Sequence, residues 1–337
     1  MRILQFAGGG KINVTEQPAP TPGPGQVLVQ TAVSALCGSE LHGYRGAGRA
    51  VGNSGHEAAG TVIALGDGVT TLQVGQRVGL CAVVGCGQCA ECTAGRYTWC
   101  SSYKVYSDMH AEQIVIPAHG CHPLPDNVSW QAGVLLSGDG LGVPYHTGTR
   151  LTDPALKTIA VFGVGPIGLG HTLLQSFYGR QVIAVDIATA RLDYAAALGA
   201  TYLADASAGD PVAQIRELTG GQGADVCIEA AGRPETLKQC FAAVRTNGTV
   251  VMNGEQPSVD LSPSQDFIRR DITAFGSWFY HYGEFPAMLA LYRQGLPVEK
   301  LVTHTFSCND ADRAFAAFAA GRTGKVLLGW DSGTVRQ

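Results

Sequence analysis

From residue 157 onward, the sequence alternates short apolar runs with longer runs of helical pattern. We predict strands at KTIAVF, QVIAVD, ADVCIEAA and GTVVMNG, with the last strand near ITAFGSWF. The helices between them are expected in GPIGLGHTLLQSFYG, RLDYAAALGA and ETLKQCFAAVR. Strands that are apolar on both faces and alternate with helices are typical of a parallel sheet covered on both sides. This part of the chain is therefore predicted to form a doubly wound parallel α/β sheet.

A glycine-rich turn stands directly after the first of these strands and opens the first helix. Gly163 permits the tight turn, Gly165 lets the backbone approach a pyrophosphate, and Gly168 lets the helix pack on the strand. The free N–H groups and the positive dipole end of the helix favour a bound phosphate. The alternative is an ordinary turn between a strand and a helix. The turn predicts a dinucleotide site made by Gly163, Gly165, Pro166, Ile167 and Gly168.

An acidic residue, Asp186, ends the next predicted strand. A carboxylate at this place can accept hydrogen bonds from the adenosine ribose hydroxyls and repels a 2′-phosphate. The sequence therefore favours NAD over NADP. Arg191 follows five residues later and is a further candidate for the cofactor site, where its charge would soften that preference. It also stands at the start of the next predicted helix.

Five of the ten cysteines crowd into residues 81–100. Four of them follow the spacing C-x2-C-x2-C-x7-C: Cys86, Cys89, Cys92 and Cys100. Closely spaced thiolates on a loop can surround one ion, and four sulfurs make a closed tetrahedral zinc site. An iron–sulfur cluster is a competing use of four cysteines, and disulfides are a third in an oxidising compartment. Five other cysteines are expected to be small buried residues: Cys81, Cys121, Cys227, Cys240 and Cys308.

Charge and hydropathy exclude several other kinds of partner. The net charge of −4 gives no electrostatic reason to expect nucleic acid or an anionic membrane surface. No run of eighteen or more apolar residues is present, so no membrane span is expected. The N-terminal segment MRILQFAGGG lacks the pattern of an export signal. A cytoplasmic location is therefore predicted.

Several segments together resemble the zinc-dependent medium-chain alcohol dehydrogenase family. They are ALCGSELHGY at 35–44, SGHEAAG at 54–60, the cysteine loop, GVGPIG, AVDIATARL, ADVCIEAAG and the closing TGKVLL. They keep the family's order over nearly the whole chain. The resemblance implies a GroES-like β-rich catalytic domain, residues 1–142 and 280–337, and an NAD-binding Rossmann domain, residues 143–279. Short runs such as QVLVQTAV and AAGTVIAL, separated by Gly- and Pro-rich turns, agree with a β-rich first domain.

The resemblance also implies a catalytic zinc ion. Cys37 matches the family's first zinc ligand, His56 its second and Asp139 its third, where the family often carries a cysteine. Thiolate, imidazole and carboxylate all bind zinc, and three protein ligands leave a fourth position for water or substrate. The alternative for Asp139 is a cap on the helix that begins there. With the cysteine loop, two zinc ions are expected for each chain.

Other site residues follow from the same resemblance. Glu57 resembles a carboxylate that approaches the metal during ligand exchange; a buried ion pair is its alternative. Ser39 is implied to accept the proton of the alcohol, and His42 to carry it toward the surface, since an imidazole titrates near neutrality. Lys325 resembles a basic residue that contacts the cofactor's pyrophosphate, and a solvated charge is its alternative.

The predicted activity is hydride transfer between a secondary alcohol, polyol or cyclitol and NAD. Zinc would assist because it lowers the pKa of a bound hydroxyl, as it does for bound water. One alternative is an NADH-dependent ketone or aldehyde reductase of a biosynthetic pathway. Another is a non-catalytic NAD-binding protein of the same fold. A small hydroxyl or carbonyl substrate and a homodimer or homotetramer are expected from the family.

Two further groups of residues are aromatic side chains and histidines near the zinc segments. Four aromatic side chains are expected to line the substrate pocket: Tyr44, Trp278, Phe279 and Tyr280. Four histidines near the zinc segments are expected to be structural, because the family's ligand set is already filled: His110, His119, His122 and His146.

Overall fold

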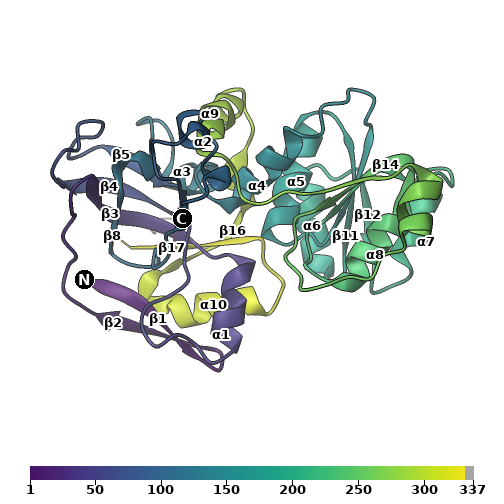
Figure 1. Ribbon diagram of the computed structural model, residues 1–337. Coiled ribbons are helices and arrows are strands. Elements are labelled where there is room, and N and C mark those ends of the chain that lie inside the picture. Colours follow the sequence, from purple (N-terminus) through teal and green to yellow (C-terminus); the bar gives the residue numbers. More distant parts are fainter. Residues whose placement is uncertain (331–337) are drawn as a thin grey trace. The chain divides into compact units, whose positions relative to one another are not determined.

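The computed structural model describes residues 1–330, and it divides into two compact units (Figure 1). The first unit contains residues 1–142 and the chain from Phe279 onward, and the second contains Val143–Trp278. The expected boundary lay one residue later, so Phe279 belongs to the first unit and not to the second. No helix in the described part of the chain is long and apolar enough to cross a membrane.

A six-stranded parallel sheet forms the centre of the second unit. In spatial order its strands are β12 (Tyr202–Asp205), β11 (Gln181–Asp186), β10 (Thr158–Phe162), β13 (Ala224–Glu229), β14 (Val244–Met252) and β15 (Thr273–Gly276). Counted along this unit, the order is 3-2-1-4-5-6, which is the order of dinucleotide-binding folds. The direction of winding reverses between β10 and β13, and ligands bind at the carboxyl ends of the strands beside such a reversal.

Helices cover both faces of this sheet, as the right-handed crossovers between parallel strands require. One pair of helices is α5 (Pro166–Phe177) and α6 (Thr189–Ala197), which contact each other and β11. The other pair is α7 (Pro211–Leu218) and α8 (Pro234–Ala243), which contact each other and lie along β12 and β13 respectively (Figure 1). The predicted doubly wound parallel sheet is therefore confirmed.

Seven strands form the main sheet of the first unit. They are β16 (Val302–Ser307), β17 (Lys325–Gly329), β3 (Gln26–Ala35), β4 (Ala58–Leu65), β5 (Arg77–Leu80) and β9 (Cys121–Pro123), with β8 (Gln113–Pro117) also paired to β3. Only the β16–β17 pair is parallel among the pairs of this sheet in the described residues. The expected β-rich first domain is therefore confirmed.

Smaller elements complete the first unit. They are the hairpin β1 (Arg2–Gly8) and β2 (Lys11–Glu16), the pair β6 (Val83–Val84) and β7 (Lys104–Val105), and the helices α1 (Leu41–Arg45), α2 (Ala90–Thr93), α3 (Trp130–Leu136), α9 (Phe285–Arg293) and α10 (Ala311–Ala319). Helix α10 buries Ala311, Ala314, Phe315 and Phe318. This is the spacing of one helical face, and it packs with Leu4, Phe6 and other residues of the β1 region in one apolar core. A further helix, α4 (Asp139–Gly148), contains the passage from the first unit to the second.

Candidate functional site

Four potential metal ligands meet at one end of the main sheet of the first unit. Strands β3 and β4 pair antiparallel with Ser34 opposite Ala58, so the end of β3 lies beside the start of β4. Cys37 therefore comes close to His56 and Glu57 although about twenty residues separate them in the chain. Asp139, the first residue of α4, completes the group. We call Cys37, His56, Glu57 and Asp139 the four-residue centre.

The ligand atoms of the four-residue centre all lie within 4.8 Å of one another. The Asp139 Oδ2 atom is 3.5 Å from Cys37 Sγ and 3.1 Å from His56 Nε2. The other ring nitrogen, His56 Nδ1, is 2.9 Å from the Ser54 carbonyl oxygen, which fixes the ring with Nε2 facing the centre. Because the Asp139 carboxylate faces Cys37 and His56, the geometry favours a ligand over a simple helix cap.

The chemistry of this centre fits a bound cation. Asp139 Oδ1 and Glu57 Oε2 are buried and have no hydrogen-bond partner in the described protein. Burial works against charge on His56, yet the neighbouring Cys37 and Asp139 raise the pKa of His56 well above its ordinary value. Two carboxylate oxygens thus point into the centre without a protein donor. One thiolate, one imidazole and a carboxylate are a ligand set that zinc accepts.

Glu57 also forms a buried ion pair, with Lys325 on β17. The Lys325 ammonium binds Glu57 Oε1 and donates to the Leu36 carbonyl oxygen at 3.2 Å. Burial opposes the charge on Lys325, but Glu57 holds the pKa of Lys325 above its ordinary value. Lys325 is only 1% exposed, so the alternative of a solvated charge is wrong. Its ammonium binds Glu57 within the first unit, and the predicted contact with a pyrophosphate stays a prediction.

Ser39 and His42 follow Cys37 directly in the chain. Ser39 lies in the helical turn Gly38–Glu40 and His42 in α1, and both residues are exposed. The structure thus places both residues at the surface, two and five positions after Cys37 in the chain. Their role in proton transfer stays a prediction.

The four cysteines of the loop also converge. Their Sγ atoms lie within 4.8 Å of one another, and Cys86 Sγ is 3.9 Å from Cys92 Sγ. Helix α2 carries Cys92, and Cys89 stands just before it. A Cβ on Gly85 would lie 2.3 Å from Cys92 Sγ, so the loop closes only with glycine there. Backbone N–H groups of Gln88 and Cys89 lower the pKa of Cys86 to about 6, which favours its thiolate.

These distances match one tetrahedral ion. With Zn–S bonds of about 2.3 Å, sulfurs at the corners of a tetrahedron lie about 3.8 Å apart. A disulfide requires sulfurs about 2.05 Å apart, and all ten cysteines are free. None of the four histidines expected to be structural belongs to either cluster among the described residues. The five cysteines expected to be buried are all buried.

The glycine-rich turn lies between β10 and α5, at the point where the sheet reverses its winding. Gly163 has φ +85°, and a Cβ there would also lie 2.8 Å from the Ala231 nitrogen. A Cβ on Gly168 would lie 2.0 Å from the Gly163 carbonyl oxygen. Pro166 and Ile167 begin α5, where proline costs no hydrogen bond. By contrast, only the Arg191 guanidinium approaches a Cβ on Gly165, at 3.8 Å, so this side of the turn has room for a ligand.

Asp186 ends β11 beside this turn. Its Oδ2 accepts the Val164 N–H at 2.9 Å, and its Oδ1 accepts the Ala188 N–H at 2.9 Å. Arg191, in α6, lies 3.8 Å from the same carboxylate. A carboxylate oxygen can accept more than one hydrogen bond, so Asp186 retains capacity for ribose hydroxyls while it holds the turn in shape.

The four aromatic residues predicted to line the pocket differ in burial. Tyr280 is fully buried, and its hydroxyl donates to the Ser137 carbonyl oxygen at 2.6 Å. Tyr44 is also buried and packs on Phe315 with ring centroids 5.5 Å apart. These two tyrosines are buried in the first unit, and their assignment to the substrate pocket stays a prediction. Phe279 is 5% exposed, whereas Trp278 is 42% exposed.

Known zinc-binding dehydrogenases are similar to this chain in sequence. Residues 23–126 match the alcohol dehydrogenase GroES-like domain, and residues 166–294 match the zinc-binding dehydrogenase domain. A probable D-xylulose reductase A of Neosartorya fischeri is 32% identical over 96% of this chain and 96% of its own length. A sorbitol dehydrogenase of Halalkalibacterium halodurans is 30% identical over 95% of this chain and 96% of its own.

A solved structure has the same fold over nearly the whole chain. An alcohol dehydrogenase from Escherichia coli CFT073, complexed with the cofactor NADH, superimposes with a TM-score of 0.87 at 27% identity. The match covers 98% of this chain and 99% of that one. Together with the two domain matches and the relatives that align over nearly the whole length, these findings confirm the family predicted from the motifs. The chain belongs to the zinc-dependent medium-chain dehydrogenase family.

Proposed function

We propose that this protein uses zinc to transfer a hydride between a secondary alcohol, polyol or cyclitol and NAD. The observation that carries the proposal is the four-residue centre, in which Cys37, His56 and Asp139 turn their ligand atoms toward one another. An NAD-binding protein without catalysis would have no use for this buried group of potential metal ligands. A reductase working on a ketone or aldehyde would use the same centre in the opposite direction.

The residues of the centre divide the work of the reaction. Zinc held by Cys37, His56 and Asp139 would act as a Lewis acid that makes the hydroxyl group of the substrate more acidic. Ser39 accepts the hydroxyl proton and His42 passes it to water, since both side chains are exposed. The carbon of the same alcohol gives its hydride to NAD, so the alcohol becomes a carbonyl compound.

The second unit supplies the cofactor site. The start of α5 and the open side of Gly165 receive the pyrophosphate, and Asp186 reads the adenosine ribose. Arg191 lies near both Gly165 and Asp186 and contributes a positive charge beside the phosphates. An acidic residue at this place supports NAD as the cofactor.

The substrate class rests on the relatives. Their names, D-xylulose reductase and sorbitol dehydrogenase, describe proteins that act on polyols and their ketoses. Both align with this chain over nearly its whole length, so we infer a small polyhydroxylated substrate here too.

We also propose a second zinc ion in the cysteine loop, where it holds the loop without taking part in the reaction. Four sulfurs leave no open position on such an ion. The free, partly exposed thiols of the loop suit the reducing cytoplasm. A homodimer or homotetramer is the assembly expected for this protein.

A substrate panel tests the proposed function. The purified protein is mixed with NAD or NADP and with polyols, sugars, cyclitols and simple secondary alcohols, and the formation of reduced cofactor is followed. The corresponding ketones are tested with NADH. At least one polyol–ketose pair should react faster with the NAD couple. Tight NAD binding without turnover of any compound would instead support the non-catalytic alternative.

A further inference from the structure

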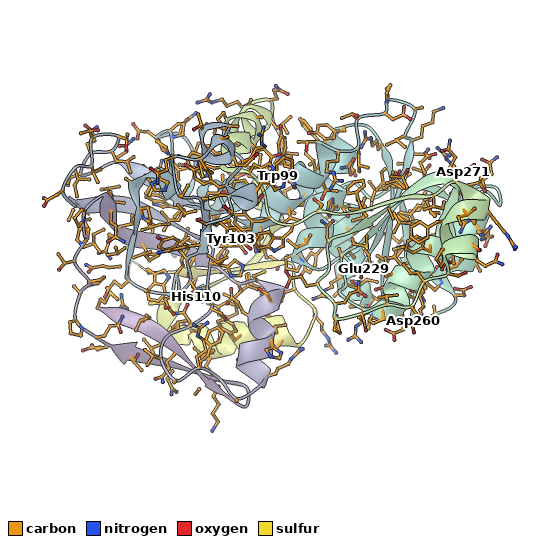
Figure 2. The ribbon with its side chains drawn as sticks, viewed as in Figure 1. Trp99, Tyr103, His110, Glu229, Asp260 and Asp271 are labelled. Carbon is orange, nitrogen blue, oxygen red and sulfur yellow. The ribbon has the colours of Figure 1, made fainter. Side chains whose placement is uncertain are left out.

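His110 is a fully buried histidine of the first unit that takes no direct part in either metal cluster (Figure 2). It lies just before β8, and the two segments that carry Cys37 and His56 both contact it. Four of the polar residues that surround it are also fully buried or nearly so: Ser34, Glu40, Asn53 and Trp330. A polar group buried this deeply requires hydrogen-bond partners, and His110 has them on both sides.

On one side, a chain of hydrogen bonds leads to Cys37. Trp330 Nε1 donates to Ser34 Oγ at 2.9 Å, and Ser34 Oγ lies 2.8 Å from His110 Nδ1. The Glu40 carboxylate can only accept, so its hydrogen bond fixes which nitrogen of His110 donates. His110 Nε2 then carries the proton and donates to Glu40 Oε2 at 2.8 Å. The other oxygen, Glu40 Oε1, accepts the Cys37 backbone N–H at 3.1 Å.

On the other side, His110 contacts the residues just before His56. A Cβ on Gly55 would lie 2.5 Å from the His110 ring, so the backbone there packs directly on the imidazole. Asn53 Oδ1 accepts the N–H groups of Gly55 at 3.0 Å and His110 at 3.3 Å. Asn53 Nδ2 also donates to the His110 carbonyl oxygen at 3.2 Å.

The Ser34–His110–Glu40 arrangement has the order of a serine–histidine–acid triad, but it cannot act as one. Ser34 is fully buried and its oxygen already accepts the Trp330 N–H. No substrate carbonyl can reach this hydroxyl. The arrangement therefore has a positioning role and not a nucleophilic one.

We propose that His110 is a positioning residue for the four-residue centre. Its imidazole keeps Glu40 against the Cys37 backbone and supports Gly55 on the opposite side, so one ring sets the spacing between the first two ligands. The identity of the metal rests on the proposed function. Removal of a group that hydrogen-bonds to metal ligands and orients them typically lowers the metal affinity about 10- to 100-fold.

Two variants of His110 separate its polar role from its bulk. The amide of glutamine reaches the place of Nε2 and can still donate to Glu40, whereas the shorter asparagine reaches only the place of Nδ1. Zinc affinity is measured by competition with a chromogenic chelator, and Cys37→Ser identifies which of the two zinc ions belongs to the centre. His110→Asn should weaken that zinc about 10- to 100-fold and leave the loop zinc unchanged. His110→Gln should keep most of the affinity.

A stability control and a second variant complete the test. Phe318→Leu loosens the nearby core around α10 and should lower the melting temperature without weakening either zinc. Glu40→Gln, which cannot accept from both Cys37 and His110, should reproduce the selective zinc loss if His110→Asn does not fold. Unchanged zinc affinity in folded His110→Asn or Glu40→Gln overturns the inference. A wild-type protein with no zinc that Cys37→Ser removes would instead count against the proposed function itself.

Discussion

The Asp186 carboxylate has a structural role in the glycine turn and a proposed role in cofactor binding. It accepts the backbone N–H groups of Val164 and Ala188, so it holds the glycine turn and the start of the next loop together. In the proposed function it also accepts hydrogen bonds from the ribose. A hydrogen bond to a charged group contributes about 1.5–3 kcal/mol, and its loss costs binding about 10- to 100-fold.

Asp186→Gly should therefore weaken NAD binding about 10-fold or more and weaken NADP binding less, because the repulsion of the 2′-phosphate is lost with the carboxylate. Dissociation constants for both cofactors, measured by fluorescence titration, check this. Asp205→Gly is a matched control, since Asp205 stands opposite Asp186 in register on β12 and its carboxylate accepts hydrogen bonds from nearby Ser207. An unchanged ratio of NAD to NADP affinity in Asp186→Gly would show that another residue selects the cofactor.

At the scale of elements, a stack of rings ties the cysteine loop to the rest of the first unit. Tyr97 from the loop stacks on Tyr282 with centroids 4.6 Å apart, and His122 of β9 lies between Tyr282 and Phe285, 4.2 Å from each. His122 Nε2 is also 3.1 Å from the Tyr280 hydroxyl. These ring contacts stabilise the short elements of the cysteine loop, which form few backbone hydrogen bonds of their own.

Tyr280 connects this stack to the start of α4. Its hydroxyl donates to the Ser137 carbonyl oxygen at 2.6 Å, two residues before Asp139. A Cβ on Gly142 would lie 2.4 Å from the Tyr280 ring, so α4 packs closely against it. The carboxylate of Asp139 thus depends on Tyr280 for its place.

Tyr280→Phe should lower kcat about 10-fold through a weakened catalytic zinc, as expected for a residue that orients a metal ligand. Tyr282→Phe is the matched control, because its hydroxyl donates to the Cys121 carbonyl oxygen and not to the segment before Asp139. Each variant should lose about 1 kcal/mol of stability. Steady-state kinetics and chemical denaturation of both variants provide the comparison. Equal losses of kcat in the two would contradict a special role for Tyr280.

The sequence motifs predicted whether a segment is a helix or a strand better than they predicted which distant residues contact it. The apolar strands and the glycine turn were evident because burial on both faces leaves a continuous apolar run. Strand β12 and helix α7 escaped prediction because they lie at the edge of the sheet and bury few residues. Lys325 was assigned to the cofactor or to solvent, since nothing local in TGKVLL shows that Glu57, 268 residues away, lies beside it.

The candidate site shows the same limit. Spacing alone indicated the cysteine loop, whose four ligands lie within fifteen residues. The meeting of Cys37 and His56 depends on the antiparallel pairing of β3 and β4, which no short motif encodes. Glu40 was missed altogether. Glu40 lies three residues after the metal ligand Cys37 and is buried. A buried acidic residue so close to a ligand needs a partner, and looking for that partner would have led to His110.

At the scale of the whole molecule, two buried histidines make stability depend on pH. Burial lowers the pKa of His122 to about 3 and that of His171, in the second unit, to about 4. Both imidazoles are therefore neutral in the folded protein, whereas in the unfolded chain they bind protons below about pH 6.5. The folded state loses stability as the pH falls from about 6.5, because the unfolded state then binds more protons.

This predicts a loss of about 1.4 kcal/mol per pH unit from His122 between pH 6 and pH 4, and a similar loss from His171 until the pH nears its folded pKa of about 4. Denaturation by urea at several pH values measures it. His122→Phe keeps a ring between Tyr282 and Phe285 but removes the titrating group, so its stability should fall less steeply with acid than that of the wild type. Release of zinc at low pH acts on both proteins, so the difference between their slopes carries the result. Parallel slopes would mean that His122 is not the group that titrates.

In the proposed function, one zinc ion on Cys37, His56 and Asp139 assists the hydride transfer, while the zinc ion of the cysteine loop only stabilises the fold. Cys37→Ser separates these roles most directly, with Cys308→Ser, a buried cysteine outside both clusters, as its control. Zinc content and NADH formation are measured on the same samples with the best compound of the substrate panel. The wild type and the control should hold two zinc ions per chain and turn over, whereas Cys37→Ser should hold one, still bind NAD and form no NADH. Turnover retained in Cys37→Ser, or a single zinc ion in the wild type, would contradict this division of roles between two zinc ions.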